Sequence, residues 1–224
     1  MTNTAKAPSE KVPRRAPQPR DAATVVIVRR DRGEAEILMG RRNRGHSFMP
    51  SKWVFPGGRI ARQDFSAPAA TELNAEVADR IADGLDGARA RAIAIAGIRE
   101  TFEETGLLLA APISSPPRRG AWQSFCAGGV APDLAGLIYF ARLITPPQRD
   151  KRFDTRFFRA DAERLVSLDP VDSKELEDVA WFSIDRCRSL ELPFATRLIL
   201  SELEASFAGE ERPFMFHRFR NIRK

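Results

Sequence analysis

Three glutamates and one arginine crowd into the eight-residue stretch RETFEETG, which runs from Arg99 to Gly106. Residues three and four positions apart are neighbours on a helix, so Glu100, Glu103 and Glu104 would share one side of it. Like charges at these spacings repel each other, and Arg99 offsets only part of the repulsion. Hard divalent cations such as Mg²⁺ prefer carboxylate oxygens. The stretch therefore indicates a cation site, with a solvated acidic helix face as the alternative.

The short run FPGG (Phe55–Gly58) precedes the glutamates in the chain. Two adjacent glycines suit a turn whose backbone must adopt unusual angles or come close to a ligand. An apolar stripe made by Ile95, Ile98 and Phe102 is expected to hold the helix against the core. The glycine turn is then expected to face the same site as the glutamates.

Together, FPGG, a following carboxylate and RETFEETGL resemble the Nudix box, G-x5-E-x7-R-E-U-x-E-E-x-G-U, in which U is a bulky apolar residue. Gly58, Asp64 and the segment Arg99–Leu107 carry the match. Asp64 stands in place of the first glutamate, and Thr101 in place of an apolar residue. Between Asp64 and Arg99 lie 34 residues where the pattern has seven, which is an insertion of 27.

The insertion points to one branch of the family. Peroxisomal coenzyme A diphosphatases belong to a branch that carries a long insertion at this place. HSFMPSKWVFPGG (His46–Gly58) and RFDTRFF (Arg152–Phe158) also resemble that branch. The resemblance implies a hydrolase that cleaves the diphosphate of a nucleoside diphosphate linked to another moiety. Coenzyme A or acyl-coenzyme A is the leading substrate, followed by ADP-ribose and dinucleotides.

The resemblance also assigns roles to residues of this chain. It implies Mg²⁺ or Mn²⁺ as cofactor, with Glu100, Glu103, Glu104 and the carbonyl of Gly58 as metal ligands. Arg99 is expected to hold the carboxylates in two-point geometry. The general base is open between a box glutamate, Glu175 and Glu177. The predicted catalytic set is Glu100, Glu103, Glu104, Arg99 and Glu177.

Several arginines are candidates for holding the substrate. Arg41, Arg42 and Arg44 precede FPGG and can grip phosphates. In RFDTRFF, Arg156 alternates with phenylalanines as in a two-faced strand and is expected to line the pocket, with an ion pair at a strand edge as the alternative. The predicted substrate-binding set is Arg41, Arg42, Arg44, Gly57, Gly58 and Arg156. A Nudix-fold module that binds a nucleotide without cleaving it is the competing class, although such proteins tend to lose box glutamates.

Hydrophobic periodicity indicates a layered fold of the α+β or α/β class. The resemblance implies more, namely an α+β fold that is an α/β/α sandwich with a mixed sheet between helices and a helical insertion at about 65–91. A helix is expected from residue 68, with Leu73, Val77 and Ile81 on its apolar face, and a second from about Ala88 to a stop at Gly106. Residues 113–135 resemble a loop. The other expected elements are strands at 23–28 and 36–40 in a hairpin, 53–58, 107–112, 136–144 paired with 154–160, and 179–184, and a helix at 193–207.

Charge and composition narrow the function further. The net charge is +6, but residues 1–20 carry +4 and residues 212–224 carry +5, which leaves −3 for 21–211. Specific nucleic-acid binding is therefore disfavoured. Apolar residues make up 43% of the chain and charged residues 29%, as in soluble globular proteins. No apolar run approaches the roughly 20 residues of a membrane span. Only two cysteines occur, far apart, which favours a reducing compartment, the cytoplasm.

The predicted organisation has three parts. Residues 1–20 form a flexible basic tail, 21–211 the catalytic domain, and 212–224 a basic aromatic segment. The aromatic residues of that last segment indicate docking onto the body of the protein or onto a second subunit in a homodimer.

Overall fold

The structure is a computed structural model of the chain, and it describes residues 16–30, 33–45, 49–210 and 212–218. Most of the predicted basic tail and the end of the C-terminal segment therefore lie outside the described residues. The helices are η1 (Arg62–Ser66), α1 (Ala75–Ile81), α2 (Gly87–Thr105), η2 (Ala162–Arg164), α3 (Ile184–Arg188) and α4 (Phe194–Phe207). The strands are β1 (Arg20–Arg29), β2 (Glu36–Arg42), β3 (Trp53–Val54), β4 (Gly57–Arg59), β5 (Ala110–Pro112), β6 (Val130–Pro132), β7 (Ile138–Ile144), β8 (Phe153–Asp161), β9 (Leu176–Ser183) and β10 (Met215–Arg218).

One mixed sheet of eight strands organises the described part of the chain, in the order β10-β7-β8-β1-β2-β3, with β4 added to β1 and β9 to β2. β1 pairs in parallel with β8 and antiparallel with β2 and β4. Its sequence RDAATVVIVR is almost wholly buried, which suits a strand covered on both faces. The predicted hairpin of β1 with β2 and the antiparallel pair of β7 with β8 are both confirmed.

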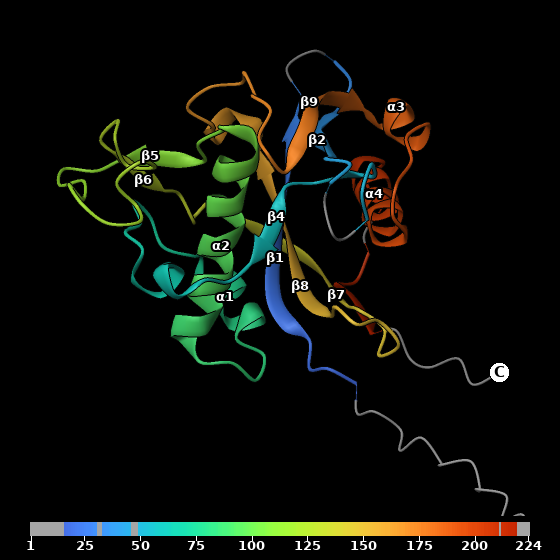
Figure 1. Cartoon of the computed structure of the whole chain (residues 1–224), viewed down its shortest axis with the longest axis horizontal. Coiled ribbons are helices and arrows are strands. Elements are labelled where there is room, and N and C mark those ends of the chain that lie inside the picture. The colour runs from blue at the N-terminus through green and yellow to red at the C-terminus, as the bar shows by residue number, and fades with distance from the viewer. Residues whose placement is uncertain (1–15, 31–32, 46–48, 211, 219–224) are drawn as a thin grey trace, which may run out of the picture.

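Helices cover both faces of the sheet, with α1 and α2 on one side and α3 and α4 on the other (Figure 1). Alternation along β1 sends Val25 and Ile27 to the α2 face and Val26 to the α4 face. On the α2 side they pack with Ile95 of the helix, and on the α4 side with Ile199. The α/β/α arrangement expected from the sequence is confirmed.

The long helix α2 begins and ends where its sequence signals indicate. The Asp86 side chain accepts a hydrogen bond from the Arg89 backbone N–H at 2.8 Å and caps the N-terminus. Gly106 ends the helix with φ 72°, in the left-handed region that glycine tolerates. A Cβ on Gly97 would lie 2.9 Å from the Val25 side chain, so this glycine lets the helix approach β1 closely. The helix is thereby held firmly over the centre of the sheet.

The insertion contains less helix than its apolar spacing indicated. A helix was expected from residue 68, but α1 starts only at Ala75, where the Asn74 side chain accepts from the Glu76 backbone N–H. The residues before it are tied to the body instead, because Thr71 bridges Asp133 and donates its hydroxyl to that carboxylate at 2.5 Å. The expected loop at 113–135 likewise contains β6, which pairs with β5.

The described part of the C-terminal segment, residues 212–218, docks onto the body. β10 adds to the edge of the sheet in parallel with β7, and Phe214 packs against Tyr139 with ring centroids 4.8 Å apart. The sequence left open whether this segment docks onto the same chain or onto a second subunit. Residues 214–218 contact the same chain. In the described residues, no helix is both long enough and apolar enough to cross a bilayer.

Candidate active site

The C-terminal half of α2 lies directly against the glycine turn of FPGG. The backbone N–H of Gly57 donates to a carboxylate oxygen of Glu104 at 2.9 Å, and Glu104 is only 3% exposed. A Cβ on Gly58 would lie 2.4 Å from the carboxyl carbon of Glu100. Glycine is thus needed at position 58 because the Glu100 carboxylate fills the space of a side chain. The turn and two of the glutamates form one unit, as the sequence suggested.

Arg99 ties this unit together. Its Nη1 donates to Glu100 and to Glu103, each at 2.8 Å, and its Nη2 donates to the carbonyl of Arg59 at 2.9 Å. Burial disfavours the charged guanidinium, but the hydrogen bond to Asp64 and the surrounding carboxylates outweigh it and raise the pKa of Arg99. Arg99 is therefore a permanent cation that positions the carboxylates.

Asp64 stays at the site despite the insertion that follows it. It is fully buried, and its carboxylate accepts from Arg99 Nε at 2.8 Å and from the Ala61 backbone N–H at 2.7 Å. The second bond caps η1, whereas α1 is capped by Asn74. Asp64 and Arg99 are therefore in contact although 34 residues separate them in the chain, and this contact joins the two halves of the box.

Burial raises the pKa of two of the glutamates. Burial is the main cause that raises the pKa of Glu104 to about 8, and Glu100 and Glu175 raise it further, against the Gly57 N–H and Arg42, which lower it. Burial likewise raises the pKa of Glu100. Glu103 differs from these two, because its side chain is 48% exposed.

A cavity of about 830 Å³ opens beside the glycine turn. At the end near the box it is lined by Glu100, Gly57, Gly58, Arg42 and Glu175. Its walls include phenylalanines from β8 and from the start of α4. This volume lies in the upper part of the range of about 300–1,000 Å³ that is usual for ligand pockets.

Seven of the predicted site residues do not line this cavity, namely Arg41, Arg44, Arg99, Glu103, Glu104, Arg156 and Glu177. Glu177 accepts from Asn43 Nδ2 at 2.6 Å and lies 3.4 Å from Arg41 Nη2, while Arg41 itself donates from Nε to Asp178 at 2.8 Å. Arg44 is exposed. Glu175, the alternative to Glu177, does line the cavity. The choice of Glu177 over Glu175 is thus not supported by its position, because Glu177 is engaged in pairing β9 to β2.

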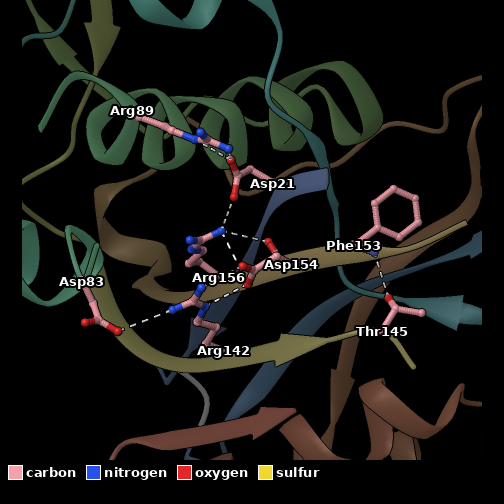
Figure 2. A network of polar contacts seen from close by, with 8 residues as sticks. All are labelled: Asp21, Asp83, Arg89, Arg142, Thr145, Phe153, Asp154 and Arg156. Atoms are coloured by element: carbon pink, nitrogen blue, oxygen red, sulfur yellow. Dashed lines mark hydrogen bonds and ion pairs between the residues drawn. The ribbon is translucent and has the colours of Figure 1, made fainter. Parts of the chain in front are cut away.

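The expectation for Arg156 is corrected in the same way. Phe153, Thr155 and Phe157 line the cavity, and Arg156 lies on the opposite face of β8, 1% exposed. Its Nη1 donates to Asp21 at 2.5 Å and lies 3.5 Å from Asp154 (Figure 2). The ion-pair alternative is the one realised. In the first half of β8, Phe153, Thr155 and Phe157 thus face the cavity, and Asp154 and Arg156 face the other side of the sheet.

This ion-pair network also anchors the insertion. Asp21 accepts from Arg89 of α2 as well as from Arg156, and Asp154 accepts from Arg142 Nη2 at 2.7 Å (Figure 2). Arg142 in turn lies 3.7 Å from Asp83, which joins α1 to α2. The network therefore connects β1, β7 and β8 to the end of the insertion, on the face away from the cavity.

Sequence reasoning missed several cations that line the cavity. They are Arg20, Arg59, Arg149, Lys151 and Arg152. A signal was present in the run TPPQRDKR, whose cations outnumber its single carboxylate between two predicted strands.

The donor set fits a hard divalent cation by its chemistry. All the carboxylates near the turn offer oxygen ligands, and burial with neighbouring negative charge raises the pKa of Glu104, as expected for a group that a cation would stabilise. Among the described residues, no group of three or more His, Cys, Asp and Glu side chains is already arranged around one point. Glu100 and Glu103 are instead held by Arg99.

The closeness of Glu100 to Gly58 leads to a first prediction. Gly58→Ala is expected to lower turnover by about a hundredfold with little loss of stability, because the new methyl group displaces only the end of a flexible side chain. The measurements are kcat and the thermal midpoint. Gly87→Ala is the control, since a Cβ there meets no atom within 4 Å. Unchanged turnover in Gly58→Ala would show that the position of the Glu100 carboxylate is not critical.

The chain resembles known proteins in sequence and in fold. No family model matches the chain. It is 27% identical, over 217 aligned positions, to the acyl-coenzyme A diphosphatase NUDT19 of Gallus gallus, and the alignment covers 70% of this chain. The chain spans 57% of that relative, which is less than two thirds of its length.

Solved structures show the same fold. A NUDIX hydrolase from Alicyclobacillus acidocaldarius superposes with a TM-score of 0.61 at 28% identity, over 84% of this chain and 92% of that one. The NUDIX domain of Shewanella oneidensis NrtR, solved with ADP ribose, gives a TM-score of 0.52 at 12% identity, over 88% and 94%. The second likeness concerns the fold alone. With the box residues assembled at the glycine turn, the chain belongs to the Nudix hydrolase superfamily.

Proposed function

We propose that the chain is a metal-dependent diphosphatase that hydrolyses a nucleoside diphosphate linked to another moiety. One observation carries the proposal: Glu100 and Glu104 are held against Gly57 and Gly58 at the end of a ligand-sized cavity. A solvated acidic helix face would leave these carboxylates exposed, whereas Glu104 is buried. The binding-only alternative is weakened because all three glutamates of the box are present.

The ligands we propose for Mg²⁺ or Mn²⁺ are Glu100, Glu103 and Glu104, with the main-chain carbonyl of Gly58. When bound, such an ion neutralises diphosphate oxygens and lowers the pKa of a coordinated water. Arg99 keeps Glu100 and Glu103 in place, and the Gly57 N–H does the same for Glu104. Arg42 lies close enough to Glu104 to lower its pKa and lines the same end of the cavity, where it suits contact with a phosphate.

Glu175 is the general base that the geometry favours. It lines the cavity, and its negative charge raises the pKa of both Glu100 and Glu104, which places it close to the proposed metal site. A base must come within hydrogen-bond reach of the attacking water, directly or through a second one. Glu177 is turned away by its contacts with Asn43 and Arg41.

The two carboxylates give a matched pair of variants. Glu175→Gln is expected to lower kcat by about a hundredfold or more, because general-base catalysis contributes about 10²–10⁴. Glu177→Gln is expected to change kcat by less than about threefold, since the amide keeps a hydrogen-bonding oxygen for Asn43. The measurement is kcat at saturating substrate, with its pH profile. The opposite ranking would return the role of base to Glu177.

Coenzyme A or acyl-coenzyme A is the leading substrate in this proposal. Support comes from the likeness to the chicken acyl-coenzyme A diphosphatase and from a cavity large enough for more than a nucleoside diphosphate. ADP-ribose and dinucleotides are the alternatives. Phosphate-bond cleavage is measured on coenzyme A, acyl-coenzyme A, ADP-ribose, NADH and diadenosine polyphosphates, with Mg²⁺, Mn²⁺ or chelator. Saturable binding of a substrate without cleavage under every condition would support the binding module instead.

Three further expectations belong to the same proposal. The catalytic domain spans residues 21–211, the protein acts in the cytoplasm, and a homodimer forms. Both cysteines, Cys126 and Cys187, are buried with free thiols, which agrees with a reducing compartment. Sedimentation of the purified chain tests the oligomeric state.

A further inference from the structure

Away from the glutamates, the cavity is bordered by the connection between β7 and β8, residues 145–152. This hairpin loop, TPPQRDKR, contributes Arg149, Lys151 and Arg152 to the lining, against one carboxylate, Asp150. Arg20, at the start of β1, lines the same end. The cavity therefore has a cationic end that is separate in the sequence from the Nudix box.

The base of the hairpin loop is firmly held. Thr145 and Phe153 form two hydrogen bonds. The Thr145 N–H donates to the Phe153 carbonyl at 2.9 Å. The Phe153 N–H donates to the Thr145 hydroxyl at 3.0 Å (Figure 2). Two prolines follow Thr145 directly and restrict the backbone. The cations of the loop are thus carried by a fixed stem at the rim of the cavity.

Arg152 is oriented without being neutralised. Its Nε donates to the Thr145 carbonyl at 3.1 Å and its Nη1 to the Pro17 carbonyl at 2.7 Å. Main-chain carbonyls carry no net charge, so the guanidinium keeps its full positive charge. The Arg20 N–H donates to the Arg152 carbonyl at 3.0 Å, which sets the N-terminal segment beside the hairpin loop.

Arginines on the two sides of the sheet differ in their pairing. On the α2 face, Arg142 and Arg156 are paired with aspartates (Figure 2). On the cavity face, no carboxylate of the described residues lies within ion-pair distance of the Arg20 or Arg149 side chain. Both arginines are exposed, and a cleft lined mainly by one sign of charge attracts ligands of the opposite sign, so this end of the cavity suits an anionic ligand. A bound anionic ligand would supply negative charge beside Arg20 and Arg149.

The stretch between the two ends is largely apolar. Phe55, Phe153 and Phe157 line it, and a nucleobase or another uncharged part of a substrate can pack there. We infer that the hairpin end of the cavity is a subsite for a phosphomonoester on the substrate, distinct from the diphosphate that is cleaved at the box. The inference rests on the proposed function, because it takes the glutamate end as the place of the diphosphate. This subsite favours nucleotides that carry an additional ribose phosphate, such as coenzyme A, over nucleotides that lack one.

The test compares coenzyme A with 3′-dephospho-coenzyme A in the full-length chain. The double variant Arg20→Ala/Arg149→Ala is expected to raise KM for coenzyme A by about tenfold to a hundredfold, with kcat nearly unchanged, because a remote contact is made equally in ground and transition states. KM for the dephospho substrate is expected to change by less than about threefold. Arg119→Ala, an exposed arginine outside the cavity lining, controls for the loss of charge.

A binding measurement keeps the subsite separate from catalysis. By calorimetry, the wild-type chain is expected to bind adenosine 3′,5′-bisphosphate at least tenfold more tightly than AMP, and the double variant to lose this preference. If both coenzyme A substrates are cleaved and the variant affects them equally, the subsite is refuted and the diphosphatase stands. If neither is cleaved but the preference for the bisphosphate depends on Arg20 and Arg149, the diphosphatase is refuted and the subsite stands. Absence of any preference in the wild type also refutes the subsite.

Discussion

Replacing Glu104 by Gln is expected to abolish turnover, by a thousandfold or more, while stabilising the metal-free protein at alkaline pH. The loss of turnover follows from removing a charged oxygen ligand next to the glycine turn. The gain in stability follows from burial, because the carboxylate is 3% exposed and its pKa is raised to about 8. An amide of the same shape can still accept from the Gly57 N–H and carries no charge to bury.

The sign of the pH effect follows from proton linkage. The ordinary pKa of a glutamate is 4.5, and burial raises the pKa of Glu104 in the folded chain to about 8. Between these pH values Glu104 binds its proton more strongly in the folded state than in the unfolded state. The free energy of unfolding of the wild-type chain therefore falls as pH rises, and the whole of this loss is present above pH 8. Glu104→Gln lacks this loss. Its thermal midpoint is expected to match the wild type near pH 4.5 and to exceed it by about 5 °C at pH 9 in chelator.

Added metal provides the control for this prediction. Mg²⁺ or Mn²⁺ is expected to raise the thermal midpoint of the wild-type chain at pH 8, because a ligand that binds only the folded state stabilises it. The effect is expected to be much smaller in Glu104→Gln. A variant that stays active, or a midpoint difference that does not grow with pH, would show that Glu104 is a structural carboxylate and not part of a metal site.

Local sequence signals located the fold and the box well. The start and stop of α2 could be predicted because a capping aspartate and a left-handed glycine act within a few residues. The placement of Glu100 and Glu104 at the glycine turn was expected from helix spacing and from the box pattern. The substrate-binding residues were harder to predict, because alternation along a strand shows that two faces exist but does not say which face is the cavity.

Arg156 and Glu177 illustrate that limit. Arg156 was assigned to the cavity, yet α2 covers its face of β8 and Asp21 of β1 pairs with it. Glu177 was preferred over Glu175, yet β9 pairs with β2 through an irregular register next to Asp178, whose φ is 55°. The local sequence pattern indicates neither the ion pair with Asp21 on a distant strand nor the register shift between β2 and β9. The cations of the hairpin loop were missed for the same reason, since only the fold brings residues 145–152 to the cavity that Glu100 lines.

Replacing Asp64 by Ala is expected to destabilise the fold by about 3 kcal/mol, because it removes the most deeply buried of the three carboxylates that pair with Arg99 and leaves Arg99 Nε without its acceptor. Asp64 is fully buried, and the Arg99 side chain is 8% exposed, so solvent cannot compensate. The same substitution removes the carboxylate that caps η1 at the Ala61 N–H. By chemical denaturation at pH 7, the midpoint should fall with little change in slope.

A surface ion pair provides the matched control. Glu76 pairs with Arg80 at 2.8 Å, but the glutamate side chain is 79% exposed, so Glu76→Ala is expected to cost less than about 1 kcal/mol. If Asp64→Ala costs no more than this control, Asp64 does not hold the two halves of the box together. The activity of Asp64→Ala, measured at denaturant concentrations below its unfolding midpoint, separates a role in stability from a role in positioning the glutamates. Because Arg99 positions Glu100 and Glu103, kcat is expected to fall by about tenfold or more in molecules that are still folded. A destabilised variant with normal kcat would mean that Asp64 supports the insertion alone and that Arg99 keeps its geometry through the carbonyl of Arg59.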